Sequence, residues 1–129
     1  MTLVIVLGVC VMLSLSAIAL YSATNLDVLI AGNKRRHTQA KLAAESGLSH
    51  FMSLNMAADD VRQFLGNQER GRVLDHINVG DGKSFYTVEV TLCSTFTPNR
   101  FYVISTGTRE KRGKILAISS VTATIETID

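Results

Sequence analysis

The side chains that could do chemistry in this sequence are scattered rather than clustered. Histidine occurs at His37, His50 and His76, and none of them has a histidine or cysteine at the spacing of a zinc site. Cys10 and Cys93 lie in different parts of the chain and indicate no metal cluster. The sequence contains no nucleophile motif and no glycine-rich phosphate loop. We therefore expect no enzyme activity, no metal and no cofactor.

Charge offers a second kind of chemistry, because basic groups can bind a partner. Two groups are candidates, namely Lys34, Arg35 and Arg36, and Arg109, Lys111 and Arg112. The first suits a solvated face beside a membrane, phospholipid headgroups or DNA. The second is predicted to lie in an exposed hairpin loop that contacts a partner subunit or an anionic ligand. The net charge of +2 is far below that of a dedicated nucleic-acid binder, so DNA contact is only a subsidiary hypothesis.

The elements that must position these groups begin with an apolar stretch. Residues 1–26 carry no charge and account for much of the 47% hydrophobic content. As a helix they would be about 39 Å long, which exceeds the ~30 Å hydrocarbon core of a bilayer. A cleaved secretory signal is disfavoured, because no basic residue precedes the apolar run. A plain transmembrane anchor and a longer helix that leaves the membrane both stay open.

A helical pattern continues beyond the apolar stretch. Across residues 26–56, apolar and small residues recur at spacings of three and four, with charged residues between them. No proline interrupts the chain before Pro98. We therefore predict one helix over about residues 2–56, with its first half outside the globule. Three glycines within it fit either tolerated flexibility or close helix–helix approach: Gly8, Gly32 and Gly47.

After position 56 the pattern changes. Residues 57–69 predict a short helix or a loop. Alternation of apolar and polar residues then predicts four half-buried strands, near residues 73–79, 86–92, 102–104 and 115–125. The predicted turns are Gly80-Asp81-Gly82, Thr97-Pro98-Asn99, and Arg109 to Gly113. Asp75, Asn78 and Asp81 lack the alternating spacing of a calcium loop, and a hairpin turn explains them.

Together these elements predict an α+β fold. The turns leave no room for a crossover helix, so the four strands are expected to pair antiparallel. A four-stranded sheet has one apolar face to cover, and only the second half of the long helix is large enough to cover it. We expect residues 1–26 to form an apolar transmembrane or filament-core segment, and residues 27–129 to form the head.

The residues of the first segment resemble those of a known superfamily. The start Met1-Thr2-Leu3-Val4, followed by a long apolar helix, resembles the mature N-terminus of type IV pilin-like proteins. Further along, a second set of residues resembles the N-terminal motif of PilX-type minor pilins. K-type minor pseudopilins of type II secretion are similar as well, because they also tend to lack a glutamate at the fifth mature position. The members of the PilX-type motif here are Ala31, Gly32, Asn33, Ala43, Ala44, Glu45, Gly47 and Leu48. The resemblance covers about residues 1–50.

The resemblance implies how the chain would be processed and assembled. Met1 would be the first residue after a prepilin peptidase removes a leader, and it would be N-methylated. The helix would anchor the subunit in the inner membrane, beside an assembly platform, before other pilin subunits join it in a filament. That filament would be an extracellular pilus or a periplasmic pseudopilus. The residues implied in core packing are Thr2, Leu3, Val4, Ile5, Leu7, Val11 and Leu15.

One residue departs from the usual pattern. Major pilins carry glutamate at the fifth mature position, where it is thought to pair with the amine of a neighbouring subunit, and this chain has Ile5. An unpaired buried charge is expensive, whereas a subunit at a filament tip has no neighbour above it. We therefore expect a minor or tip subunit. The alternatives are a major pilin that dispenses with this glutamate, and a non-polymerising single-span envelope protein whose head binds a ligand.

Overall fold

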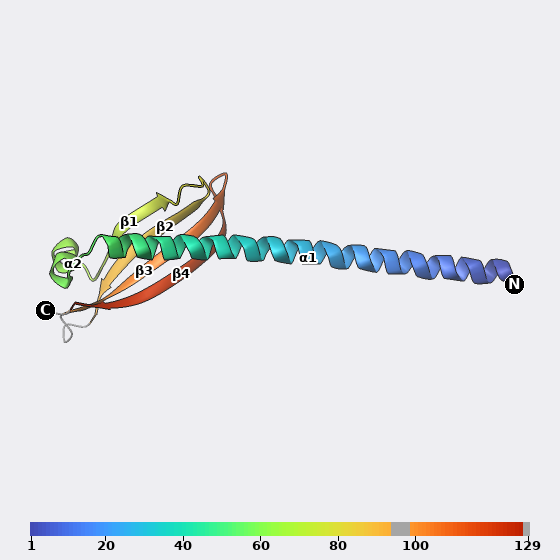
Figure 1. Cartoon of the computed structure of the whole chain (residues 1–129), viewed down its shortest axis with the longest axis horizontal. Helices are drawn as coiled ribbons and strands as arrows, with labels where there is room; N and C mark the ends of the chain where they lie inside the picture. The colour runs from blue at the N-terminus through green and yellow to red at the C-terminus, as the bar shows by residue number, and fades with distance from the viewer. Residues whose placement is uncertain (94–98, 128–129) are drawn as a thin grey trace. The chain divides into compact units, whose positions relative to one another are not determined.

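A computed structural model describes residues 1–93 and 99–127. Its elements, labelled in Figure 1, are α1 (Thr2–Ser53), α2 (Ala58–Leu65), β1 (Arg70–Asn78), β2 (Ser84–Leu92), β3 (Arg100–Lys111) and β4 (Lys114–Glu126). The chain forms two compact units, Met1–Arg35 and Arg36–Asp129. The first unit consists of α1 residues, and the second holds the rest of α1, α2 and the sheet.

Helix α1 is uninterrupted from Thr2 to Ser53, as the absence of proline predicts. It ends slightly before the predicted residue 56. The last amides, those of Leu54 and Asn55, bond to the carbonyls of Phe51 and Met52, which tightens the final turn. Asn55 then takes a φ of 50°, a left-handed conformation that terminates helices.

In the second unit, the sheet has the order β1-β2-β3-β4 with every neighbouring pair antiparallel. The end of α1 crosses one face of this sheet (Figure 1). The helix residues buried against it are Ala40, Ala43, Ala44, Gly47 and Phe51. The predicted α+β arrangement, a long helix packed on a four-stranded antiparallel sheet, is therefore confirmed.

The core lies between the helices and the two central strands. Its buried members are Phe51, Ala58, Val61, Leu65, Tyr86, Val88, Val90, Phe101 and Val103. The rings of Phe51 and Phe101 meet edge to face, with centroids 6.2 Å apart. The helix thus supplies core residues to a head whose sheet has one apolar face to bury.

Residues 57–69 form a helix at their centre. The N–H of Ala57 donates to the Asp60 carboxylate (3.0 Å), which satisfies one of the free donors at the start of α2. The helix ends at Leu65, and Gly66 follows with a φ of 57°. A Cβ on Gly71 would lie 2.7 Å from the Leu65 side chain, so α2 packs closely on β1.

One predicted turn needs correction, and another cannot be compared. The turn between β3 and β4 is Arg112-Gly113, with φ values of 54° and 74°. A two-residue hairpin turn of type I′ has positive φ at both positions, and no further residues are required. Residues 109–111 therefore belong to β3, and the prediction of a longer loop from Arg109 was wrong. The predicted turn residues Thr97 and Pro98 lie outside the described residues.

Strand β1 is less regular than its alternating pattern predicted. Its register against β2 shifts between Arg72 and Leu74 and again between Leu74 and Ile77. Such bulges let two residues oppose one on the neighbouring strand, so simple alternation fails. Val79, predicted to lie in this strand, falls beyond its end and is exposed.

Candidate functional site

One surface of the chain has the character of an interface. Large apolar side chains of α1 are exposed along the whole first unit, and Leu3 and Ile5 are 80% and 64% exposed. Others are Val4, Val6, Leu7, Val9, Val11, Met12, Leu13, Leu15, Ile18 and Leu20. Soluble monomers rarely expose so large a continuous apolar surface. The helix is long and apolar enough to cross a membrane.

Three hydroxyl side chains within this apolar surface are bonded inside the helix. The hydroxyls of Ser14, Ser16 and Thr24 donate to the carbonyls of the residues four positions earlier, at 2.8–2.9 Å. These bonds satisfy the hydroxyl donors without water. These three hydroxyls can therefore enter lipid, or a packed bundle of helices, without losing their hydrogen bonds.

The N-terminal end of this surface lacks any negative charge. Ile5 donates its backbone N–H to the Met1 carbonyl (3.2 Å) and presents an exposed apolar side chain. The first acidic residue of the chain is Asp27. Among stems of this sequence packed side by side at the same level, no carboxylate would lie near the Met1 amine.

The residues between Ala31 and Leu48 that resemble the PilX-type motif, called the stem motif below, lie partly on the surface and partly in the core. Its exposed members are Ala31, Asn33 and Glu45. Gly32 and Leu48 are half-buried, and Ala43, Ala44 and Gly47 are buried. The second half of the motif therefore holds the head together. The structure shows no contact role for the first half.

The closest contact between helix and sheet uses two glycines. A Cβ on Gly47 would meet the Ser105 hydroxyl and would lie 2.7 Å from the Tyr86 ring. A Cβ on Gly107 would meet the backbone of Ala40 and Ala44. Gly47 does lie at a close approach, but its neighbours belong to strands β2 and β3, whereas the sequence predicted approach of another helix. Gly107 was missed, although a glycine inside a strand pattern signals close backbone approach.

The two basic groups differ in availability. Lys34, Arg35 and Arg36 are exposed, as are Lys111 and Arg112. Arg109 is not, because its guanidinium donates to the Asp81 carboxylate (2.5 Å) and the Ser84 hydroxyl (2.9 Å) and is only 15% exposed. The second group therefore offers the side chains of Lys111 and Arg112, whereas Arg109 ties β3 to the β1–β2 turn.

Asp81 organises this turn. Its carboxylate accepts the backbone N–H of Lys83 (2.9 Å) and both the N–H and the hydroxyl of Ser84. These hydrogen bonds, led by the one from Lys83 and helped by Arg109, hold the pKa of Asp81 well below its usual value. Asp81 therefore acts within the turn, whereas Asp75 lies in β1 and pairs with Arg72.

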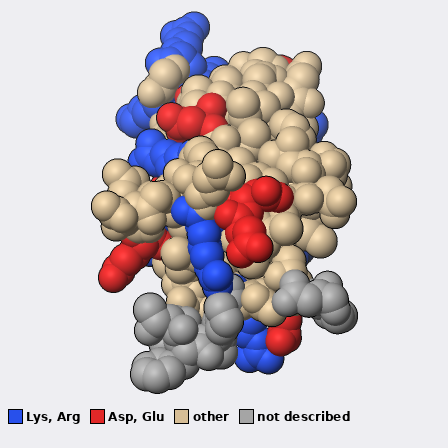
Figure 2. All heavy atoms as spheres, turned by 90° about the vertical axis from the view of Figure 1, so that its left-hand side faces the viewer, with Lys and Arg blue, Asp and Glu red and all other residues tan. Residues whose placement is uncertain are grey.

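The charged side chains of the head do not form a field of one sign on the face that carries α2. Figure 2 shows basic and acidic residues interspersed there among neutral ones. Nucleic-acid surfaces instead gather lysine and arginine on one face or along one helix. This face therefore lacks the electrostatic pattern of a DNA-binding surface.

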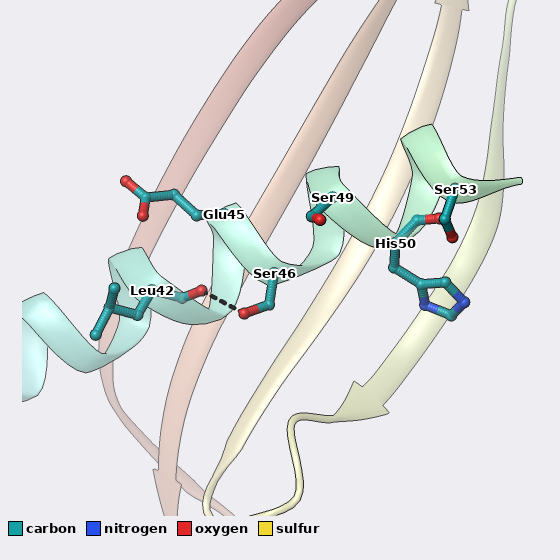
Figure 3. Close-up of a pocket in the computed structure, with 6 residues that line it drawn as sticks. All are labelled: Leu42, Glu45, Ser46, Ser49, His50 and Ser53. Atoms are coloured by element: carbon teal, nitrogen blue, oxygen red, sulfur yellow. Dashed lines mark hydrogen bonds between the residues drawn. The ribbon is translucent and has the colours of Figure 1, made fainter. Parts of the chain in front are cut away.

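A shallow hollow of about 530 Å³ follows one side of α1 (Figure 3). It is lined by Leu42, Glu45, Ser46, Ser49, His50 and Ser53. The hydroxyls of Ser46 and Ser53 donate to helix carbonyls. The Nδ1 of His50 lies 2.6 Å from the Tyr86 hydroxyl, so this imidazole also bonds within the head. Most of its polar groups are thus already engaged, and its geometry indicates no catalytic site.

The remaining candidates for chemistry stay apart. His76 stacks on Phe85 with ring centroids 4.2 Å apart, and Cys10 and Cys93 are free thiols. Within residues 1–93 and 99–127, no three histidine, cysteine, aspartate or glutamate residues gather as metal ligands. The apolar surface of α1 is therefore the feature with the clearest functional character.

Comparison with known proteins agrees with this focus on the N-terminal helix. Residues 1–49 match the family model described as PilX N-terminal. The first part of the chain is therefore a PilX-type, type IV pilin-like segment, as its residues predicted. No curated protein and no solved structure matches the chain significantly.

Proposed function

We propose that the chain is a structural, non-enzymatic subunit of a type IV pilus or a related secretion filament. One observation carries the proposal. The segment that matches the PilX N-terminal family also bears the exposed apolar helix surface, and the hydroxyls of Ser14 and Ser16 are satisfied within the helix. Such a surface is suited first to lipid and then to a bundle of similar helices.

Ile5 supports a minor or tip position within that filament. Residues 1–26 offer no carboxylate to an N-terminal amine buried in the filament core. Burying a charge without a partner costs several kcal/mol (~3–5 is typical when a buried pair loses one member). A subunit with few neighbours above it avoids most of this cost, because its amine stays nearer to solvent.

The proposal includes the partners that a pilin-like subunit requires. They are other pilin subunits, a prepilin peptidase that exposes Met1, and an inner-membrane assembly platform. The subunit is expected in the inner membrane before assembly and afterwards in a surface filament or periplasmic pseudopilus. Methylation of Met1 belongs to the same proposal, and mass spectrometry of the N-terminal peptide tests it. DNA contact forms no part of it.

The function is tested by placing a short epitope after Asn67, in the exposed loop between α2 and β1. Filaments sheared from cells are then imaged with gold-labelled antibody. Gold at filament ends is expected for a tip subunit, and gold along the shaft indicates a major subunit. A membrane-bound subunit with no gold on filaments, although the epitope is displayed, would support the single-span alternative instead.

A matched pair of stem variants sharpens this experiment. Val11→Asp places a charge on the apolar surface, where it costs about 2.5–3.5 kcal/mol at the centre of a membrane. We expect Val11→Asp to be lost from filaments and Val11→Leu to be retained. Both should keep the folded head, because Val11 is exposed and lies outside the second unit. Equal filament incorporation of both variants would contradict packing through this surface.

A further inference from the structure

The outer edge of β4 is the second unusual surface of the chain. Strand β4 stands at one end of the sheet, and no described strand pairs with its outer side. It runs from Lys114 to Glu126, and residues 115–125 between them include no charge, proline or glycine. Natural sheets usually guard their edges with charges, proline or bulges, because an open edge templates strand addition.

The other edge of the sheet is guarded. Strand β1 carries Arg70, Arg72 and Asp75 and contains two register shifts. His76 also has a φ of 48°, which turns the backbone away from a regular strand. Strand β4 also has one register shift, at Leu116, but its pairing is regular from Ala117 to Glu126. This regular stretch of β4 is therefore the edge that is open to pairing.

The hydrogen bonds of the sheet identify which amides of β4 are free of β3. The N–H of Thr127 donates to the Asn99 carbonyl (2.9 Å), so this opposed pair is hydrogen-bonded. Bonded pairs alternate along an antiparallel ladder, and the β3–β4 register is unbroken between this end and Arg109. The amides that point outward are therefore those of Ile118, Ser120, Thr122, Thr124 and Glu126.

The side chains on the helix side of β4 also lack full cover. Val103 and Ser105 of β3 are buried under α1, whereas their partners Ala123 and Val121 on β4 are only half-buried. A strand added beside β4 would bring its own side chains over this region. An extended segment could therefore bond to the outward amides of β4 and also cover the half-buried side chains on its helix side.

A second copy of this chain is a poor occupant. An antiparallel β4–β4 pair related by a twofold axis would run the α1 segments beyond Arg36 in opposite directions. The proposed function instead requires the N-terminal helices of neighbouring subunits to point in the same direction within one membrane or filament. A parallel pair would instead place Lys114 beside Lys114 and Glu126 beside Glu126, which is repulsive.

We propose that β4 receives an extended strand from a different subunit of the same assembly, by strand addition. The partner strand is uncharged over its centre, carries small apolar side chains toward α1, and has an acidic residue near Lys114. Lys111 and Arg112 at the adjacent turn strengthen the preference for that acid. At the C-terminal end of β4, Glu126 pairs with Arg100 (3.0 Å). The basic end of the partner strand lies beside Glu126.

The test uses the full chain in detergent micelles and a synthetic peptide. The peptide alternates threonine and valine between a terminal aspartate and a terminal lysine. Alternate amides are N-methylated, so that only one edge of the peptide can pair. At about tenfold excess over its dissociation constant, the peptide should slow amide exchange about tenfold at the five outward amides of β4. A peptide methylated at every amide should have no effect.

Variants at one position complete the test. Ser120→Pro removes an outward N–H and the hydroxyl that bonds to Thr106, but it removes no backbone bond to β3. Edge strands tolerate proline at such positions. Ser120→Val loses the same hydroxyl but keeps the amide. We expect Ser120→Pro to weaken peptide binding at least about tenfold, while Ser120→Val binds as the unmodified chain does. If Ser120→Pro fails to fold, the fully methylated peptide still decides the question.

Three results would overturn the inference. They are exchange protection at β1 in place of β4, unchanged binding by folded Ser120→Pro, and concentration-dependent protection of the β4 amides without peptide. The last would identify a second copy as the occupant. The inference rests on the proposed function for its choice of partner, but this experiment contains no filament. Failure here and failure of the filament-labelling experiment are therefore separate outcomes.

Discussion

Ser105 donates its hydroxyl to the carbonyl oxygen of Ala44 at 2.6 Å, and both residues are fully buried. The bond joins the middle of β3 to α1 where Gly47 and Gly107 let the two backbones approach. Helix and sheet are therefore fitted to one another by small residues and one buried hydrogen bond, as well as by apolar burial.

The glycines at this contact predict a graded series of stabilities. Gly107→Ala should lower the free energy of unfolding by about 3 kcal/mol, because the new methyl group meets helix backbone that cannot rotate away. Gly47→Ala should cost less, about 1–2 kcal/mol, because its neighbours are side chains and alanine favours the helix by up to ~1 kcal/mol. Urea unfolding of the full chain in micelles, followed by circular dichroism, measures both.

Gly32→Ala is the matched control, since no atom lies within 4 Å of the position of its added Cβ. It should leave the head as stable as before. Equal losses in all three variants would show that the effect arises from glycine replacement in general and not from the contact.

Tyr86 predicts a loss of stability in alkali. Burial raises the pKa of its phenol, so the folded state favours the neutral form. Its contribution is complete below the unfolded pKa of about 10 and is lost as pH rises through the folded value. Tyr86→Phe should cost about 1 kcal/mol at neutral pH, through loss of the bond to His50, and should remove this alkaline decline.

Unfolding free energies measured from pH 7 upward test this expectation. Tyr102→Phe serves as the control, because that ring is 44% exposed. A decline that persists in Tyr86→Phe would assign the effect to another group.

The lowered pKa of Asp81 predicts that the free energy of unfolding falls at low pH. Its folded pKa is lowered, so its contribution is present above the unfolded pKa of about 4 and is lost as pH falls below that value. Asp81→Asn should be less stable than the unmodified chain at pH 7. The difference in unfolding free energy between the two proteins should narrow as pH falls below about 4. The reason is that the Asp81 carboxylate takes up a proton at a higher pH in the unfolded state than in the folded state. Denaturant unfolding at several pH values measures this difference, and a difference that widened in acid would contradict this assignment.

Ile5 predicts a change of position within the filament. If its lack of charge restricts the subunit to ends, Ile5→Glu should move the gold label toward the shaft, because the new carboxylate can pair with a neighbour's amine. Ile5→Gln is the control, since it is polar but uncharged. Labelling that stays at the ends in both variants would remove Ile5 as the determinant of position.

Much of the fold could be predicted from the sequence because its periodicities are strong. The uninterrupted helix followed from the spacing of residues such as Ala40, Ala44 and Gly47, and the antiparallel sheet from alternation and short turns. The same logic failed in β1, where register shifts around Leu74 broke the alternation. Bulges depend on the neighbouring strand, so the sequence of one strand does not reveal them.

The site could be predicted less completely. The apolar surface of α1 was evident from composition, since no charge interrupts residues 1–26. The engagement of Arg109 with Asp81 was not, because it joins residues far apart in sequence across a hairpin. The open edge of β4 required knowledge of strand order, which local patterns do not supply.

The contact of Gly107 with α1 has a mechanical consequence. Strand β3 is bonded to β2 on one side and to β4 on the other along most of its length. A pull along the helix beyond Arg36 would reach the sheet at this central strand, where two ladders of backbone hydrogen bonds would share the shear. The head is thereby built to carry tension through its middle, while its outer edge stays unloaded and available.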